Sequence, residues 1–215
     1  MVTDNVAPRR PGAILHAALS YDVMLWFATR GRERALRERL LDLAKLQQGD
    51  AVLDVGCGTG TVAILARHRV GETGRVCGID ASPEMIARAK VKAESGGMDV
   101  RFQNASAQAL PFPEASFDVT LSTLMLHHLG RNGRMDLARE MCRVSRPGGR
   151  ALIVDFATPT RTRKGILKHF RHGHGSVAPD EVIGIVNSAG FEVIASGAVG
   201  AMGLHFVLAA KPRPL

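Results

Sequence analysis

The sequence lacks several features that would place it in common classes of protein. Its 215 residues include one Trp, one Tyr and three Cys, and no two Cys are spaced C-x-x-C. The cysteines therefore predict neither a disulfide framework nor a zinc site, and they favour a reducing, cytoplasmic location. With so few aromatic side chains available for base stacking, nucleic acid is disfavoured as a partner.

A long apolar run is also missing. The stretch AILHAALSYDVMLWFA contains His16 and Asp22 and is short for a membrane span. The first residues, MVTDNVAPRRPG, have no apolar core of the kind found in signal peptides. The formal net charge of +8 favours anions, without choosing among acidic substrates, phospholipid surfaces and nucleic acid. We expect a soluble protein, attached at most to a membrane surface.

Apolar periodicity and turn residues predict alternating helices and strands. The expected helices cover 13–29, 32–46, 60–69, 83–94, 132–145 and 179–189, and the expected strands 51–55, 75–80, 99–105, 117–123, 150–156, 191–197 and 204–211. This order predicts an α/β fold with a mostly parallel seven-stranded sheet, helices on both faces and an antiparallel C-terminal hairpin at its edge. Residues 1–46 are expected to be a tail with lid helices, and 47–215 the main domain, together forming one globular unit.

The stretch VLDVGCGTG places a glycine loop directly after the first strand of that sheet. A dinucleotide fingerprint would require glycine at position 61, where Thr61 stands, and no lysine follows the glycines as it would in a P-loop. Asp54 precedes the loop, and a carboxylate there disfavours a pyrophosphate but suits an ammonium group. Asp80, at the end of the next strand, suits two ribose hydroxyls. A nucleoside with a cationic amino-acid portion and no phosphate fits these residues, and S-adenosylmethionine is such a ligand; the ordinary alternative is that both carboxylates cap loops.

These segments resemble the class I methyltransferases, in particular the group that includes the ubiquinone and menaquinone methyltransferases. VLDVGCGTG is similar to the family's first motif and GIDASPEMIARAK to its second, while ALPFPEASFDVTLSTLMLHHL and EMCRVSRPGGRALIVDF match later strands. The resemblance covers roughly residues 20–212 and implies a Rossmann-like fold. It also implies methyl transfer from S-adenosylmethionine to a small-molecule or lipid-like acceptor.

The resemblance assigns cofactor contacts residue by residue. The methionine end would lie along the glycine loop, the ribose on Asp80, and the sulfonium above Thr123 at the end of the fourth strand. Ser106 stands where many relatives have Asp or Asn, and Tyr21 would close over the cofactor. The implied cofactor-binding residues are Tyr21, Asp54, Gly56, Cys57, Gly58, Thr59, Gly60, Asp80, Ala81, Met85, Ser106, Ala107 and Thr123.

Two adjacent histidines follow the fourth strand. A general base is required only if the acceptor carries a proton, and we expect His128 to supply it, with His127 in the substrate pocket. A structural role for either histidine is an open alternative. The quinone methyltransferases carry Arg-Asn at these two positions, so methylation of a quinone ring is a candidate and not the default. A non-catalytic, cofactor-binding regulatory protein is the alternative from another class.

The basic segment RTRKGILKHFRHGHG follows the fifth strand. His172 and His174 would enter the substrate pocket if this segment forms a lid. Its five basic residues, together with Arg9 and Arg10, could instead face an anionic membrane, with apolar residues 25–27 dipping into the bilayer. A solvated basic surface is the simplest alternative. No metal site is expected, because too few further ligands lie nearby.

Overall fold

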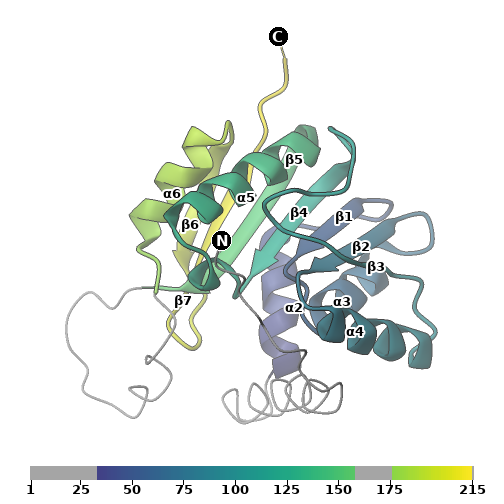
Figure 1. Cartoon of the computed structure of the whole chain (residues 1–215). Coiled ribbons are helices and arrows are strands. Elements are labelled where there is room, and N and C mark those ends of the chain that lie inside the picture. The colour runs from purple at the N-terminus through teal and green to yellow at the C-terminus, as the bar shows by residue number, and fades with distance from the viewer. Residues whose placement is uncertain (1–32, 158–175, 215) are drawn as a thin grey trace, which may run out of the picture.

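The computed structural model describes residues 33–157 and 176–214. A seven-stranded sheet forms the middle of the molecule, and helices cover both of its faces (Figure 1). The first half contains α2 (Glu33–Ala44), β1 (Ala51–Val55), α3 (Thr61–Val70), β2 (Arg75–Asp80), α4 (Pro83–Ser95) and β3 (Arg101–Asn104). The second half contains β4 (Phe117–Thr123), the 3₁₀ helix η1 (Leu126–His128), α5 (Arg131–Val144), β5 (Ser145–Phe156), α6 (Pro179–Ser188), β6 (Glu192–Ala198) and β7 (Leu204–Ala210).

The sheet has the strand order β3-β2-β1-β4-β5-β7-β6. Strands β1 to β5 pair in parallel, whereas β7 pairs antiparallel with both β5 and β6. The α/β architecture predicted from the sequence is thereby confirmed, including the C-terminal hairpin with β6 at the edge. Because the strand order reverses beside β1, the carboxyl ends of β1 and β4 border the crevice where ligands bind in such sheets.

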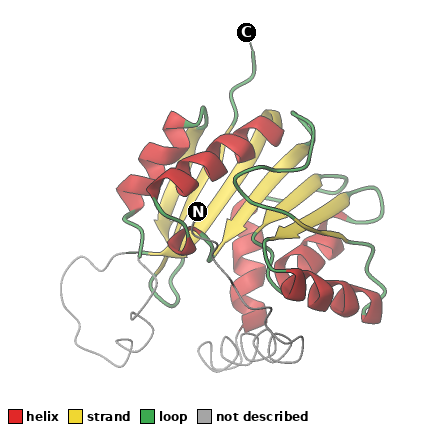
Figure 2. Ribbon diagram, in the orientation of Figure 1, coloured by secondary structure: helices red, strands yellow, loops and turns green. Residues whose placement is uncertain are grey.

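Helices lie on both faces of the sheet (Figure 2), and an apolar layer packs them against each face. One layer joins α2, α3 and α4 to side chains of the sheet such as Val52, Leu121 and Leu152. The other joins α5 and α6 to the opposite face, where Leu53 and Ile153 are buried. Successive strand residues point to opposite faces, so this parallel sheet, covered on both sides, requires nearly continuous apolar strands. The strand β1 meets that requirement except at Asp54.

Several element boundaries differ from the prediction. The strand β5 begins at Ser145 and not at 150, because Phe117 pairs with Ser145 and Val119 with Arg150, leaving an irregularity between them. Residues 147–149 therefore bulge within β5, where the sequence predicts a turn before it. The helix η1 was not predicted. Ser82 caps α4 as expected, since its hydroxyl accepts the backbone N–H of Met85 at 3.2 Å.

The N-terminal region is described only from residue 33 onward, and the expected helix at 13–29 and the basic segment 161–174 lie outside the described residues. The division of the chain at residue 46 stays a prediction. Within the parts of the chain that the structure describes, no helix is long and apolar enough to cross a membrane.

Candidate active site

The carboxyl ends of five parallel strands meet along one edge of the sheet. We call the ends of β1, β2 and β3, with the loops that follow them, the cofactor end. We call the ends of β4 and β5, with η1, the acceptor end. Most residues singled out in the sequence lie in one of these two groups.

The glycine loop of the cofactor end is fixed by its own backbone. The N–H groups of Gly56 and Cys57 both donate to the carbonyl of Ile79 in β2, each at 2.8 Å. The N–H of Gly60 donates to the carbonyl of Cys57 at 2.9 Å. Gly56, Gly58 and Gly60 have φ angles of 75°, 53° and 78°, in the left-handed region that favours glycine. The backbone conformation of the loop therefore favours glycine at these three positions.

The three glycines differ in what a side chain would meet. A Cβ on Gly56 would lie 2.5 Å from Cγ of Met125, and one on Gly60 would lie 2.6 Å from the Phe102 ring. These two glycines make room for protein side chains, whereas the sequence predicted that the loop glycines admit the ligand. On Gly58, by contrast, no heavy atom of the described chain lies within 4 Å of an added Cβ. Gly58 thus marks where the loop faces open space.

Asp80 lies beside Gly58, and two backbone N–H groups donate to its carboxylate. Its Oδ2 accepts the N–H of Gly58 and its Oδ1 the N–H of Ser82, both at 2.9 Å. The side-chain amide of Asn104, at the end of β3, and the backbone N–H of Ala105 after it donate to the Asp80 carbonyl. A carboxylate has about four lone-pair sites, so both oxygens retain acceptor capacity. The hydrogen bonds fix the Asp80 carboxylate at the expected ribose site. The same carboxylate caps two loops, which is the alternative role that the sequence analysis left open.

Asp54 is a buried carboxylate inside the first strand. Its exposed fraction is 0%, and neither oxygen accepts a hydrogen bond from residues 33–157 or 176–214. Burial raises the pKa of Asp54 to about 7, an effect opposed by the charge of Arg37 and reinforced by that of Asp80. The N–H of Ala63 lowers the pKa without meeting the geometry of a hydrogen bond. A buried carboxylate without a donor fits a site that receives a cationic group.

Two side chains of the loop face the protein interior. The Thr59 hydroxyl accepts from Nζ of Lys92 in α4 at 3.0 Å, and the Thr61 hydroxyl accepts from the same Nζ at 2.9 Å. The Cys57 thiol is buried, and its burial together with the charges of Asp54 and Asp80 raises its pKa far above the ordinary range. Cys57 is therefore a neutral, packed side chain. Contacts of Thr59 and Cys57 with a ligand, if made, would use their backbone atoms.

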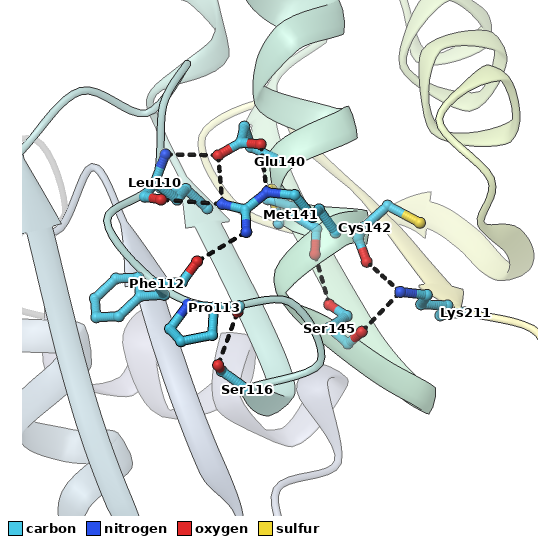
Figure 3. Close-up of polar contacts among 10 residues, drawn as sticks. Leu110, Phe112, Pro113, Ser116, Glu140, Met141, Cys142, Ser145 and Lys211 are labelled. Atoms are coloured by element: carbon cyan, nitrogen blue, oxygen red, sulfur yellow. Dashed lines mark hydrogen bonds and ion pairs between the residues drawn. The ribbon is translucent and has the colours of Figure 1, made fainter.

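The loop between β3 and β4 carries the predicted adenine contacts, Ser106 and Ala107. It is fastened to α5 by Arg143, which donates to the carbonyls of Leu110 and Phe112 at 3.0 and 2.8 Å (Figure 3). Glu140 accepts the N–H of Leu110 at 2.7 Å and also accepts from Arg143. This pairing lowers the pKa of Glu140 and raises that of Arg143. We call Glu140 and Arg143 the α5 clamp.

Three further cofactor-binding predictions fall on described residues. Ala81 is exposed directly after Asp80, and Met85 is half-buried in the first turn of α4. Thr123 ends β4 and is half-buried. All three remain predictions, since the structure gives their positions and no contact with a ligand.

At the acceptor end, one histidine is joined to a carboxylate that the sequence analysis did not single out. Nδ1 of His127 lies 2.7 Å from Oδ1 of Asp155, and the His127 N–H donates to Oδ2 at 3.1 Å. The side chains are 9% and 4% exposed. His128 is exposed, and its ring centroid lies 4.0 Å from that of His127. No spacing rule links residues 127 and 155, so only the sheet could have revealed this pair.

The remaining predicted residues, Tyr21, His172 and His174, lie outside the described residues. Within the described ranges, no group of three or more His, Cys, Asp or Glu side chains could hold a metal ion.

Comparison with known proteins agrees with this geometry. A family model described as a methyltransferase domain matches residues 52–149. The ubiquinone/menaquinone biosynthesis C-methyltransferase of Azotobacter vinelandii is 31% identical over 167 residues, covering 76% of this chain and 65% of that protein. The 27-O-demethylrifamycin SV methyltransferase of Amycolatopsis mediterranei is 40% identical over 123 residues, covering 56% of this chain and 44% of that protein. This chain therefore spans less than two thirds of the length of both relatives.

A solved structure, that of an S-adenosylmethionine-dependent methyltransferase from Aquifex aeolicus, has a TM-score of 0.69 and 26% identity. The match covers 81% of this chain and 88% of that one. The strand order, the glycine loop with its two carboxylates and these similarities support the assignment of the chain as a class I S-adenosylmethionine-dependent methyltransferase. Within that class it is similar to the ubiquinone/menaquinone C-methyltransferases, and S-adenosylmethionine is the cofactor that family and fold imply.

Proposed function

We propose that the protein transfers a methyl group from S-adenosylmethionine to a small-molecule or lipid-like acceptor. The observation that carries the proposal is the group formed by Gly58, Asp80 and Asp54 at the cofactor end. Gly58 faces open space, Asp80 is held beside it by the Gly58 N–H, and Asp54 is a buried carboxylate without a donor among the described residues. A ribose diol and an ammonium group would satisfy the two carboxylates, and no phosphate site is needed.

The residues of this chain would contribute mainly by positioning. Bound S-adenosylmethionine supplies an electrophilic methyl group. Asp80 and the loop beside Gly58 would fix the nucleoside, and Asp54 the amino-acid portion, so that the methyl group faces the acceptor end. Holding two reactants in line, about 3 Å apart, can supply a large part of the rate enhancement of a displacement.

The proposal is tested by calorimetry and by turnover. We expect S-adenosylmethionine and its product S-adenosylhomocysteine to bind with micromolar affinity and NAD to bind at least a hundredfold more weakly. Formation of S-adenosylhomocysteine in the presence of an acceptor panel measures the reaction. Tight binding of NAD would overturn the cofactor assignment. Tight binding of S-adenosylmethionine without turnover of any acceptor would instead favour the non-catalytic regulatory alternative.

Two kinds of acceptor follow from the relatives. The Azotobacter relative is named as a C-methyltransferase of ubiquinone and menaquinone biosynthesis, and the Amycolatopsis relative as a methyltransferase of 27-O-demethylrifamycin SV. A ring-bearing, lipid-like acceptor is consistent with the first, and a hydroxyl acceptor with the second. The His127-His128 pair, in place of the Arg-Asn of the quinone enzymes, makes ring methylation of a quinone a candidate and not our first choice.

A lipid-like acceptor would be drawn from a membrane surface, so we also propose contact with anionic lipid through Arg163, Lys164, Lys168 and Arg171, which lie outside the described residues. Each basic residue near such a surface contributes about 1 kcal/mol. Sedimentation with vesicles tests this. Binding to anionic but not neutral vesicles, lost in high salt and in the variant with all four residues changed to Ser, is expected; indifference to vesicle charge would end the idea.

A further inference from the structure

The pair formed by His127 and Asp155 is the most highly organised group of side chains at the acceptor end. Asp155 accepts three N–H groups: Nδ1–H and the backbone N–H of His127, at 2.7 and 3.1 Å, and the backbone N–H of Phe156 at 2.7 Å. The carboxylate is thereby held on both oxygens. Because both the backbone N–H and the ring Nδ1–H of His127 donate to Asp155, the imidazole has a fixed orientation.

The carboxylate also determines which ring nitrogen carries the proton. An ionised Asp side chain can only accept hydrogen bonds, so a nitrogen 2.7 Å from its oxygen must be protonated. The neutral imidazole of His127 is therefore the tautomer with the proton on Nδ1 and the lone pair on Nε2. A base whose other nitrogen is oriented by a carboxylate is the arrangement found in nucleophile-activating sites.

The chain places the start of η1 against the cofactor end. Met125, two residues before His127, packs in the space that a side chain on Gly56 would occupy. On its other side η1 is fastened to the helical layer, because Arg134 of α5 donates to the carbonyl of Leu126 at 3.0 Å and pairs with Glu181 of α6. The helix η1 thus begins against the glycine loop and is held at both sides.

Other charged and titratable groups surround the pair. His128 lies against the His127 ring on η1, and His205 of β7 stands opposite Asp155 in the strand register. Burial lowers the pKa of His205, although the charge of Asp180 opposes the shift.

We propose that His127 is the general base of the reaction, that Asp155 positions it, and that the acceptor is an aromatic hydroxyl. This inference rests on the proposed function. A phenol has a pKa of about 10 and an ordinary imidazole a pKa of about 6.5. A positioned imidazole can accept the phenol proton as it leaves in the transition state. An aliphatic hydroxyl is a far weaker acid, so the same imidazole would be a less effective base for it. The ring of Phe156, 5.3 Å from that of His127, offers an aromatic neighbour.

In the proposed step the acceptor oxygen forms a bond to the methyl carbon as the carbon–sulfur bond breaks and leaves its electron pair on sulfur. The O–H bond breaks at the same time, and its proton passes to Nε2 of His127. The resulting imidazolium is stabilised by Asp155, which keeps its own charge. Neither an oxidant nor a second co-reactant is required.

The first test needs neither cofactor nor acceptor. Long-range ¹H–¹⁵N spectra of the imidazole side chains, assigned with His127→Gln, should show His127 with Nδ1 protonated and Nε2 unprotonated at pH 8. In Asp155→Asn one position of the carboxylate becomes an NH₂ group, which cannot accept from both His127 donors, so this signature should change. A His127 ring protonated on Nε2 in the unmodified protein would overturn the proposal.

The second test measures methyl transfer to 1,4-dihydroxynaphthalene, kept reduced, with 1,4-dimethoxynaphthalene as the matched probe that lacks a hydroxyl. We expect O-methylation of the first probe alone, slowed about 10²–10³-fold by His127→Gln and by Asp155→Asn, and less than about threefold by His128→Gln. Affinity for S-adenosylmethionine should change less than twofold in all three variants. Equal slowing by His127→Gln and His128→Gln, or undiminished transfer by His127→Gln, would overturn the assignment.

The outcomes separate this inference from the function on which it rests. If the unmodified protein does not bind S-adenosylmethionine, the proposed function fails before any variant is compared. If it binds the cofactor and methylates carbon but not the aromatic oxygen, or neither probe, then the acceptor class inferred from His127 and Asp155 is wrong while the cofactor assignment stands.

Discussion

The cofactor end and the acceptor end of the sheet are held together by different kinds of contact. At the cofactor end the contacts are mainly of the backbone: the N–H groups of Gly56 and Cys57 meet one carbonyl of β2, and Asp80 accepts two further N–H groups. At the acceptor end a side chain of β5 holds a side chain of η1, and the two residues are 28 positions apart. Both ends depend on the assembled sheet, since Gly58 and Asp80 are themselves 22 positions apart, but at the cofactor end each partner belongs to a motif that the sequence indicates.

This difference determines what can be altered at each end. A loop fixed by its own backbone tolerates few side chains, because left-handed φ angles and close packing both exclude them. A pair of side chains can be changed without moving the strands that carry them. Substitutions at the cofactor end should therefore affect binding of the cofactor, and substitutions at the acceptor end the rate of transfer at unchanged cofactor affinity.

The largest effect is expected from Gly58→Val. The side chain would enter the space beside Asp80 and exclude the cofactor, so we expect affinity for S-adenosylmethionine to fall at least about a hundredfold, which is about 2.7 kcal/mol. Gly97→Val is a matched control, since Gly97 also has a positive φ, 63°, and no heavy atom of the described chain within 4 Å of an added Cβ. The free energy of unfolding should fall by about 1–2 kcal/mol in both variants, because a residue with a Cβ is strained in the left-handed conformation.

Calorimetry and urea unfolding of the two glycine variants separate strain from exclusion. Comparable cofactor affinity in both variants would show that the region beside Gly58 does not receive the ligand.

A smaller loss of affinity is expected from Asp80→Ala. Removing hydrogen bonds to a charged group costs about 1.5–3 kcal/mol, so the dissociation constant of S-adenosylmethionine should rise by about ten- to 150-fold. Asp99→Ala removes an exposed carboxylate before β3, at the opposite edge of the sheet, and should leave affinity unchanged. Circular dichroism checks that the Asp80 variant is folded. Unaltered affinity in a folded Asp80→Ala protein would refute the ribose assignment.

The pH dependence of binding sharpens the role of Asp54. Its pKa of about 7, against 3.8 in an unfolded chain, means that folding without cofactor takes up a proton between these values. The free energy of unfolding should therefore fall as the pH rises from about 4 to about 7. A cofactor ammonium group favours the charged carboxylate, so cofactor affinity should rise about tenfold between pH 6 and pH 7.5, with release of a proton at the lower pH.

Asp54→Asn should remove both pH dependences at Asp54. Calorimetry in buffers of different ionisation enthalpy counts the released protons. A proton release in the Asn variant equal to that in the unmodified protein would assign the linkage to another group.

The sequence indicates the segments of the cofactor end because each of them is a contiguous motif, and their contacts with the cofactor stay predictions. Asp54 and Asp80 each end or lie within a predicted strand, and the glycine spacing alone argued against a dinucleotide. What the sequence could not indicate is which glycine faces open space and which ones pack against other side chains. Gly56 and Gly60 make room for Met125 and Phe102, which come from distant parts of the chain, so their role follows only from packing.

The acceptor end was harder to predict for a similar reason. The sequence indicates two adjacent histidines and favours His128 as the base, but a preference between neighbours requires knowledge of what each one contacts. The partner Asp155 lies in a buried strand, where an acidic residue carries no motif. The start of β5 was also missed, because the proline and glycines at 147–149 are typical of a turn and here form a bulge that remains paired to β4.

The smallest predicted effect concerns the α5 clamp, and it tests whether the cofactor end depends on contacts from outside its own backbone. Arg143→Ala removes the donors to Leu110 and Phe112 and leaves Glu140 without its ion pair. We expect the free energy of unfolding to fall by about 1–3 kcal/mol. Cofactor affinity should fall only about threefold, because Asp80 and the glycine loop keep their own contacts.

Arg139→Ala is the matched control on the same helix. The Arg139 side chain is 65% exposed and lies 3.7 Å from Asp136, so its removal should change the free energy of unfolding by less than about 0.5 kcal/mol. Urea unfolding and calorimetry on the two arginine variants give the comparison. If Arg143→Ala lowers the affinity for S-adenosylmethionine as much as Asp80→Ala does, the loop after β3 is as important for binding as the loop after β1. The cofactor end would then depend on side-chain contacts from α5 as well as on its own backbone hydrogen bonds.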